Sequence, residues 1–311
     1  MGNCLKWEKT PIDSSWEQAN KEMKYFMKKK HKNKKYQELK DMKGGNGYPF
    51  SINNELFVKV QLKRKGAEKN LQQLQNIKTH AGSGEFDTGY KRLCLLKDFY
   101  ESSDSIILIY PKLKCDLSQY LNKHRENIKP KSRDKILLSI LDAIMYLHSK
   151  GYAHRDIKLE NILLLNDEHA VLCDLEHAYN VTEFGMKGTK EYYPTPNVVN
   201  TLLQGRQDLS TAQKMKWLDY YAFGKTVAMV MCMTQPFKQP IKVIWTNWCE
   251  KQRSSAFPYS SFMNVLAIQH MWWDCVYKLC INNEKAVYNN FQKLFDLNDI
   301  KILIKSKYNV Y

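Results

Sequence analysis

The sequence predicts an α+β protein in which a small β-rich lobe is followed by a larger helical lobe. Strand-like patterns dominate up to residue 110, whereas helical periodicity dominates from residue 117 onward. With 311 residues, of which 43% are hydrophobic, the chain can bury the core that two packed lobes require. We divide it into a basic extension (residues 1–43), a β-rich lobe (44–110), a helical lobe (111–298) and a C-terminal tail (299–311).

The composition restricts the class of partner. A formal net charge of +16 favours anionic partners: nucleoside phosphates, a phospholipid surface, nucleic acid or an acidic protein. Nucleic acid is the least favoured, because the chain has no recognisable nucleic-acid-binding module. Eight cysteines without a C-x-x-C pair argue against a zinc site and fit a reducing compartment. Since the first thirty residues also lack an apolar run of signal-peptide length, we expect a cytoplasmic protein.

The extension is rich in lysine and contains a dense basic run from Lys28 to Lys35. Gly2 and Cys4 stand where acyl chains can be attached, although Lys6 occupies a position at which Ser or Thr is preferred. An acyl chain together with the lysine run would meet the two-signal requirement for stable membrane attachment. Contact with a membrane surface, a plain solvated tail and a nucleic-acid patch all stay open for this segment.

The β-rich lobe begins with a glycine-containing segment formed by Gly44, Gly45 and Gly47. Backbone amides without side chains can approach phosphate oxygens, although an ordinary turn would use the same residues. The alternating run Leu56–Gln61 then predicts a strand that carries Lys59 among apolar neighbours. A charge in that place requires a partner.

A helix is predicted after this strand, because apolar residues recur at three-residue spacing at Leu71, Leu74 and Ile77. Two further strand-like runs follow, Arg92–Tyr100 and Ser105–Tyr110, and a polar turn separates them. These elements complete a small, mostly β unit.

The helical lobe contains a clear amphipathic helix that Gly151 can terminate, with apolar residues on one face at Ile136, Ile140, Ile144 and Leu147. Two short strands are predicted next, Ile162–Leu165 and Ala170–Cys173, joined by a polar turn. The pattern is helical again beyond residue 210. A short hairpin therefore lies between helices.

Polar residues flank this hairpin in a pattern that favours metal binding. The segment His154–Asn161 reads HRDIKLEN, and Asn161 directly precedes the first strand of the hairpin, whereas Asp174 directly follows the second. Because a hairpin brings its two ends together, the two oxygen-bearing side chains are expected to converge on one hard cation. Asn161 and Asp174 are therefore the predicted ligands of this cation, and a triphosphate would supply the remaining oxygens.

The HRDIKLEN segment resembles the catalytic loop of eukaryotic-type protein kinases, of which this chain would be a divergent member. The resemblance implies a bilobal fold, ATP and Mg²⁺ as cofactors and a protein as substrate. It implies that Asp156 is the base toward the acceptor hydroxyl, with Asn161 and Asp174 on the metal. Lys158, two residues after Asp156, matches the lysine of the Ser/Thr branch and would contact the transferred phosphoryl group.

The resemblance also assigns a nucleotide site. Lys59 is similar to the strand lysine that pairs with the α- and β-phosphates. Gly45 and Gly47 would cover the phosphates, and backbone groups near Tyr110 and Lys112 would bind the adenine. In the family a helical glutamate holds the strand lysine, and here two residues stay open for that role, Glu68 and Gln73.

Other neighbours of the site follow from the same resemblance. Asp219 would begin a central helix and brace the catalytic loop. Thr189 would either carry a regulatory phosphate, as Thr182 also could, or orient Asp156 and Lys158.

Some residues depart from the family pattern. Glu176 stands where a glycine is expected, and Pro194, Thr195 and Pro196 replace a motif that normally ends in an acid. These departures motivate an alternative function, a pseudokinase that acts as a nucleotide-binding or scaffold module.

Overall fold

The protein is described by a computed structural model, which covers residues 14–40, 47–63, 67–81, 89–124, 128–180, 189, 192 and 210–232. The chain divides into two compact units. The first holds the residues up to Thr79 together with Leu95–Leu113, and the second holds His80–Cys94 and the chain from Lys114 onward. The predicted residues Gly2, Cys4, Gly44, Gly45, Thr182 and Pro194–Pro196, and the tail 299–311, lie outside the described residues.

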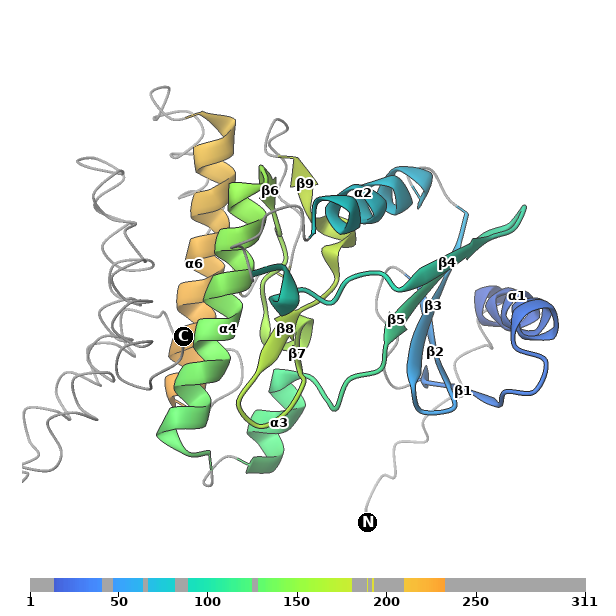
Figure 1. Ribbon diagram of the computed structural model, residues 1–311, viewed down its shortest axis with the longest axis horizontal. Helices are drawn as coiled ribbons and strands as arrows, with labels where there is room; N and C mark the ends of the chain where they lie inside the picture. The colour runs from blue at the N-terminus through green and yellow to red at the C-terminus, as the bar shows by residue number, and fades with distance from the viewer. Residues whose placement is uncertain are drawn as a thin grey trace, which may run out of the picture. The chain divides into compact units, whose positions relative to one another are not determined.

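The first unit contains a five-stranded antiparallel sheet in the order β1-β2-β3-β5-β4 (Figure 1). Lys59 lies in the middle of the central strand, opposite Pro49 on one neighbouring strand and Leu108 on the other. The strands are β1 (Tyr36–Glu38), β2 (Tyr48–Ile52), β3 (Leu56–Leu62), β4 (Asp98–Glu101) and β5 (Ser105–Pro111).

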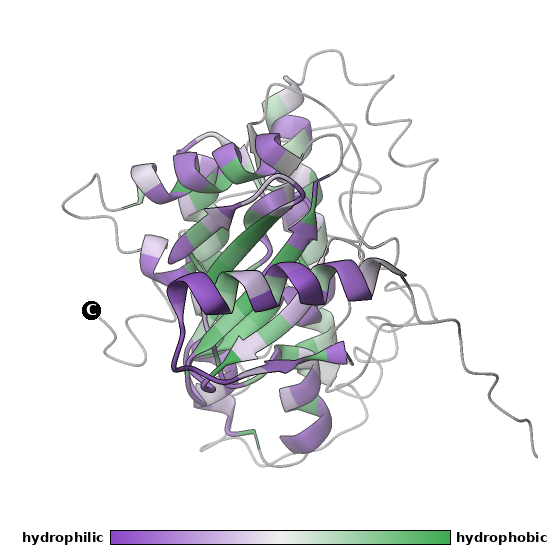
Figure 2. Ribbon diagram, turned by 90° about the vertical axis from the view of Figure 1, so that its right-hand side faces the viewer, coloured by the Kyte–Doolittle hydropathy of each residue, from purple (hydrophilic) through white to green (hydrophobic). Residues whose placement is uncertain are grey.

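Helix α1 (Ser14–Lys30) covers one face of this sheet, and Figure 2 shows it crossing the strands. Its buried residues recur at helical spacing and pack against alternate residues of β3, among them Val58 and Val60. Because side chains alternate across a strand, Lys59 belongs to the opposite face. The buried residues of α1 are Ala19, Met23, Phe26 and Met27.

The boundary predicted at residue 43 therefore does not separate an extension from the lobe. Residues 14–30 complete the hydrophobic core, and β1 pairs with β2. The many lysines between the apolar residues of α1 hid its amphipathic pattern, and β1 is only three residues long. As a consequence, the glycine-containing segment joins two paired strands.

Helix α2 (Ala67–His80) confirms the predicted helix, and Leu71, Leu74 and Ile77 are all buried. The predicted strand Arg92–Tyr100 is wrong in its first part, because β4 begins only at Asp98. Cys94, which precedes β4 and belongs to the second unit, instead donates from its amide to the Leu172 carbonyl of the same unit at 2.8 Å. A short 3-10 helix, Gly89–Arg92, precedes that contact.

The second unit is mainly helical, and α4 and α6 lie side by side in it (Figure 1). The predicted apolar face, Ile136 to Leu147, is buried, and α4 ends just before Gly151, whose φ of 79° is a conformation that glycine adopts freely. Its elements are α3 (Leu117–His124), α4 (Pro130–Ser149), β6 (Tyr152–Ala153), β7 (Ile162–Leu164), β8 (Ala170–Leu172), β9 (Tyr179–Asn180) and α6 (Thr211–Cys232). Over the described ranges, no helix combines the length and the apolar character needed to cross a bilayer.

Candidate active site

The loop that carries Asp156 follows β6, and its backbone amides donate hydrogen bonds to a buried carboxylate on α6. Asp219 has no exposed surface, and it accepts hydrogen bonds from the backbone amides of His154 at 2.7 Å and Arg155 at 2.8 Å. Asp219 therefore braces the loop as predicted, although it lies in the middle of α6 and does not begin it.

This bracing stabilises an unusual backbone conformation. Arg155 has a φ of 71°, in the left-handed region that residues other than glycine rarely adopt. Such a conformation costs of order 1–3 kcal/mol and persists only where surrounding contacts enforce it. The hydrogen bond from the Arg155 amide to Asp219 is such a contact, and it fixes the direction in which the next residue, Asp156, leaves the backbone.

Asp156 is only 5% exposed, and both oxygens of its carboxylate are engaged. Oδ1 accepts from the Thr189 amide at 3.0 Å and the Thr189 hydroxyl at 3.1 Å. Oδ2 accepts from Asn161 Nδ2 at 2.9 Å and lies 2.8 Å from Lys158 Nζ. The structure therefore brings together the three predicted catalytic residues Asp156, Lys158 and Asn161.

Opposing effects set the protonation of Asp156. Burial alone would raise the pKa of this carboxyl, but the hydrogen bond and positive charge of Lys158, together with His154 and the Thr189 amide, outweigh burial, and the pKa lies below its ordinary value. Asp156 is therefore an anion at neutral pH and can accept a proton or a hydrogen bond from a hydroxyl group.

Asn161 and Asp174 lie at the same end of the β7–β8 hairpin. The register pairs Ile162 with Leu172, and a further bond from the Cys173 amide to the Asn161 carbonyl at 2.9 Å extends the ladder by one step. The Asn161 amide nitrogen donates to the Asp156 carbonyl at 2.8 Å as well as to its carboxylate, which leaves Oδ1 as the side chain's acceptor atom.

This pair of oxygen donors fits the preference of Mg²⁺ for carboxylate and amide oxygens. The described residues contain no cluster of three or more His, Cys, Asp or Glu that could hold a metal on its own. Two protein ligands are what a nucleotide-bound Mg²⁺ requires, since phosphates and water complete its shell. Asp174 has a φ of 61°, a strained conformation that aspartate tolerates better than most residues. Glu176, the departure from the family pattern, is buried.

Two further residues hold the site together, and sequence reasoning gave them no role. His154 joins the loop to the hairpin, because its Nε2 lies 2.8 Å from the Cys173 carbonyl and its Nδ1 accepts from the Asp156 amide at 3.2 Å. The buried hydroxyl of Tyr192 accepts from the Leu159 amide at 3.3 Å. Burial raises the pKa of Tyr192 well above its ordinary range. The one feature of the sequence that could have indicated the contact between Tyr192 and Leu159 is the position of Tyr192 shortly after Thr189.

The predicted nucleotide residues of the first unit include Gly47 and Lys59, which are in close contact. A Cβ on Gly47 would lie 2.9 Å from Lys59 Cγ and 3.1 Å from the Val60 carbonyl oxygen, so a side chain there would force its neighbours to shift. Glycine is thus favoured at position 47 because the stem of Lys59 lies against it. The phosphate-binding roles of both residues stay predictions.

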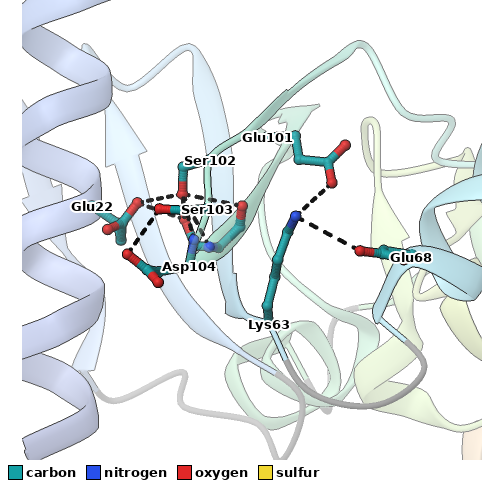
Figure 3. Close-up of polar contacts among 8 residues, drawn as sticks. Glu22, Lys63, Glu68, Glu101, Ser102, Ser103 and Asp104 are labelled. Atoms are coloured by element: carbon teal, nitrogen blue, oxygen red, sulfur yellow. Dashed lines mark hydrogen bonds and ion pairs between the residues drawn. The ribbon is translucent and has the colours of Figure 1, made fainter.

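Glu68 is directed toward a lysine other than Lys59. Its carboxylate lies 3.7 Å from Lys63 Nζ, which also pairs with Glu101 at 2.7 Å (Figure 3). The Glu68 side chain is 79% exposed. These contacts disfavour Glu68 as the partner of Lys59 and leave Gln73 open for that role. Only Gln73 Oε1 could accept from an ammonium group, because Nε2, which is buried without a hydrogen-bond partner among the described residues, is a donor.

The backbone amide of Lys112 is not available to an adenine ring. It donates to the Glu55 carbonyl at 2.9 Å, while Lys112 Nζ bonds to Ser51 Oγ at 3.1 Å and Asn54 Oδ1 at 2.9 Å. Lys112 thus fastens the end of β5 to the β2–β3 turn. The prediction that backbone groups near Tyr110 and Lys112 bind adenine is therefore restricted to groups other than this amide.

The fold and the site together define the class of protein. A five-stranded antiparallel sheet with a central lysine, a helical unit and an HRD loop braced by a buried aspartate are the parts of a bilobal α+β kinase fold. Comparison with known families agrees, since residues 52–280 match the model of the protein kinase domain. The chain belongs to the protein kinase family.

Individual relatives share modest identity. The chain is 27% identical over 195 residues to "Probable serine/threonine-protein kinase FMP48" of Saccharomyces cerevisiae, covering 58% of this chain and 52% of that protein. It is 33% identical over 123 residues to "Dual serine/threonine and tyrosine protein kinase" of Gallus gallus, covering 40% of this chain and 12% of that protein. It is 31% identical over 112 residues to "Serine/threonine-protein kinase US3 homolog" of Gallid herpesvirus 2, covering 33% and 27%. The chain thus spans about half the length of these relatives or less.

Proposed function

We propose that this chain is an ATP-dependent protein serine/threonine kinase that transfers the γ-phosphoryl group of ATP to protein hydroxyls. The observation that carries the proposal is the held carboxylate of Asp156. Its oxygens are fixed by Asn161, Lys158 and Thr189, and its pKa is lowered below the ordinary value. A fixed anion beside a lysine is suited to orient a hydroxyl nucleophile next to a negatively charged phosphoryl group.

Each residue then has a distinct task. Asp156 accepts the proton or hydrogen bond of the acceptor hydroxyl. Lys158, whose Nζ is 2.8 Å from that carboxylate, neutralises charge on a phosphoryl group delivered there. Asn161 and Asp174 would hold Mg²⁺, which when bound neutralises phosphate charge. Lys59 would bind the α- and β-phosphates from the first unit.

Two observations support serine and threonine as acceptors. Lys158 occupies the position typical of the Ser/Thr branch, and two of the relatives named above carry serine/threonine kinase names. The relative from Gallus gallus is named for both kinds of acceptor. Phosphoamino-acid analysis of the product distinguishes these specificities.

Phosphotransfer by the purified full chain tests the proposal. The chain is incubated with labelled ATP, Mg²⁺ and a basic protein substrate, beside an Asp156→Asn variant that keeps the shape of the side chain. We expect label on serine or threonine with the wild type and a loss of about 100-fold or more with the variant. Equal labelling by both proteins would refute the role of Asp156.

The alternative is a pseudokinase scaffold, favoured by the pairing of Glu68 with Lys63 and by the buried Glu176. Nucleotide binding separates the two functions in part. A kinase must be stabilised by Mg²⁺ and ATP in a thermal-shift assay, because a ligand that binds only the folded state raises its apparent stability. Absence of both stabilisation and phosphotransfer would favour the scaffold.

A further inference from the structure

The side of α1 that faces away from the sheet is strongly basic. Lys21, Lys24 and Lys28 are exposed, and at about 3.6 residues per turn they lie along one side of the helix. Lys29 lies at the edge of this side and donates a hydrogen bond to the Tyr100 hydroxyl of β4 at 3.2 Å. We call Lys21, Lys24 and Lys28 the basic face. Glu17 is the one acidic residue on the same side. Further exposed lysines extend the positive charge beyond the face, at Lys30, Lys32, Lys34 and Lys35.

The basic face is presented by a helix that is firmly attached. Besides its apolar contacts with the sheet, α1 is held by Glu22. Its Oε2 accepts from the Ser102 hydroxyl at 2.7 Å (Figure 3) and from the Ser105 hydroxyl at 2.9 Å. This link fixes the rotation of α1 about its axis. The lysines consequently cannot turn toward the sheet unless the hydrogen bonds of Glu22 break.

Local stability accounts for only part of these charges. Lysines in the last turn interact favourably with the helix dipole, which explains Lys28 and Lys29 in part. That effect is confined to the last turn, so it does not reach Lys21 or Lys24. Within the described ranges, Lys21, Lys24 and Lys28 form no ion pair, although Glu17 stands four residues before Lys21, and the Asn20 hydrogen bond and, more weakly, the charge of Lys24 lower the pKa of Glu38.

The chemistry of the surface favours lipid headgroups over nucleic acid. The segment 14–40 contains lysines but no arginine, the residue preferred for bidentate recognition of individual phosphates. Tyr25 is 55% exposed beside the face, and Lys29 Nζ lies 5.8 Å from its ring centroid and 5.2 Å from that of Tyr100. Exposed tyrosine next to lysine is suited to the headgroup level of a bilayer.

We propose that the basic face of α1 binds an anionic phospholipid surface. Each lysine near such a surface strengthens binding by roughly fivefold, so that three of them contribute about 100-fold. The proposal is independent of kinase activity, because the basic face contains none of the residues of the active site. It also does not depend on acyl chains at Gly2 or Cys4, which lie outside the described residues.

Vesicle sedimentation of the full, unacylated chain tests the proposal. We expect binding to phosphatidylcholine vesicles that contain about one-third phosphatidylserine, and a steep loss of binding as salt is raised. Changing Lys21, Lys24 and Lys28 together to Gln should weaken binding by about 100-fold. The matched control changes three exposed lysines of the second unit to Gln, namely Lys91, Lys123 and Lys129, and should weaken it by less than about fivefold.

Three results would overturn the proposal. One is an equal loss of binding in the two triple variants, which would show a response to net charge alone. Another is binding to pure phosphatidylcholine that matches binding to the anionic vesicles. The third is displacement of the chain from anionic vesicles by duplex DNA or RNA at equal phosphate concentration, which would assign the face to nucleic acid.

Discussion

Replacing Asp219 by Asn should destabilise the fold and also reduce phosphotransfer, although Asp219 lies in α6 and not in the catalytic loop. The carboxylate accepts hydrogen bonds from two backbone amides, at 2.7 and 2.8 Å, and its Oδ2 lies 2.9 Å from His148 Nε2. An amide offers one oxygen and places an N–H group against at least one of these donors. Each buried donor left without a partner costs about 1–3 kcal/mol.

We therefore expect the Asp219→Asn variant to lose about 3 kcal/mol of unfolding free energy. At about 2–4 °C per kcal/mol for a domain of roughly this size, the melting temperature should fall by about 6–12 °C. The backbone of Arg155, with a φ of 71°, would then be free to relax and displace Asp156. A displacement of about 1 Å can reduce kcat by about 100-fold.

Thermal unfolding followed by circular dichroism measures the first effect, and kcat at a temperature where the variant is folded measures the second. Asp98→Asn is the control, because Asp98 is exposed and its side chain bonds to the neighbouring amide of Phe99 at 2.8 Å. That control should stay within about 0.5 kcal/mol of the wild type. If the Asp219→Asn variant melts within about 1 °C of the wild type, the bracing role of Asp219 is refuted.

Three further predictions concern other contacts. Changing Lys158 to Met removes the strongest of the contacts that oppose the burial of Asp156 and should raise its pKa, so the acidic limb of the pH profile of kcat/KM moves to higher pH; an unchanged limb would contradict this. In the wild type the pKa of Asp156 is lowered. The ionised carboxylate therefore stabilises the fold at pH values above the ordinary pKa of about 3.9, and this stabilisation is lost as the pH falls through the lowered pKa. Changing Glu22 to Gln should cost about 1–2 kcal/mol in urea unfolding, because Ser102 loses a charged acceptor. Phe26→Ala should cost about 3–5 kcal/mol through the cavity it leaves, and an unchanged unfolding midpoint would show that α1 is not part of the core.

The local features of the fold could be predicted from the sequence because they depend on neighbours in the chain. The β7–β8 hairpin, the helix that contains Leu71 and the end of α4 at Gly151 follow from periodicity and turn residues. The HRD loop is also a local pattern, which is why Asp156 could be predicted as a site residue.

Features that depend on distant residues were missed or left open. The contact of Tyr192 with Leu159 joins residues 33 positions apart, and the link from Glu22 to Ser102 spans 80. Neither side chain carries a local signal for its partner. The role of α1 in the core was missed for a related reason, since its lysines dominate the composition while four apolar side chains define its buried face.

Thr189 shows how such distant contacts decide between two roles that the sequence left open, a regulatory phosphate or the orientation of Asp156 and Lys158. Its hydroxyl donates to Asp156 Oδ1 at 3.1 Å and accepts from Lys158 Nζ at 2.9 Å, so both of its hydrogen-bonding directions are in use. A phosphate on that oxygen would remove the donated proton and place negative charge beside the carboxylate, which is repulsive at such short range. The arrangement is thus compatible with an unmodified Thr189 that fixes the lysine and the carboxylate relative to each other.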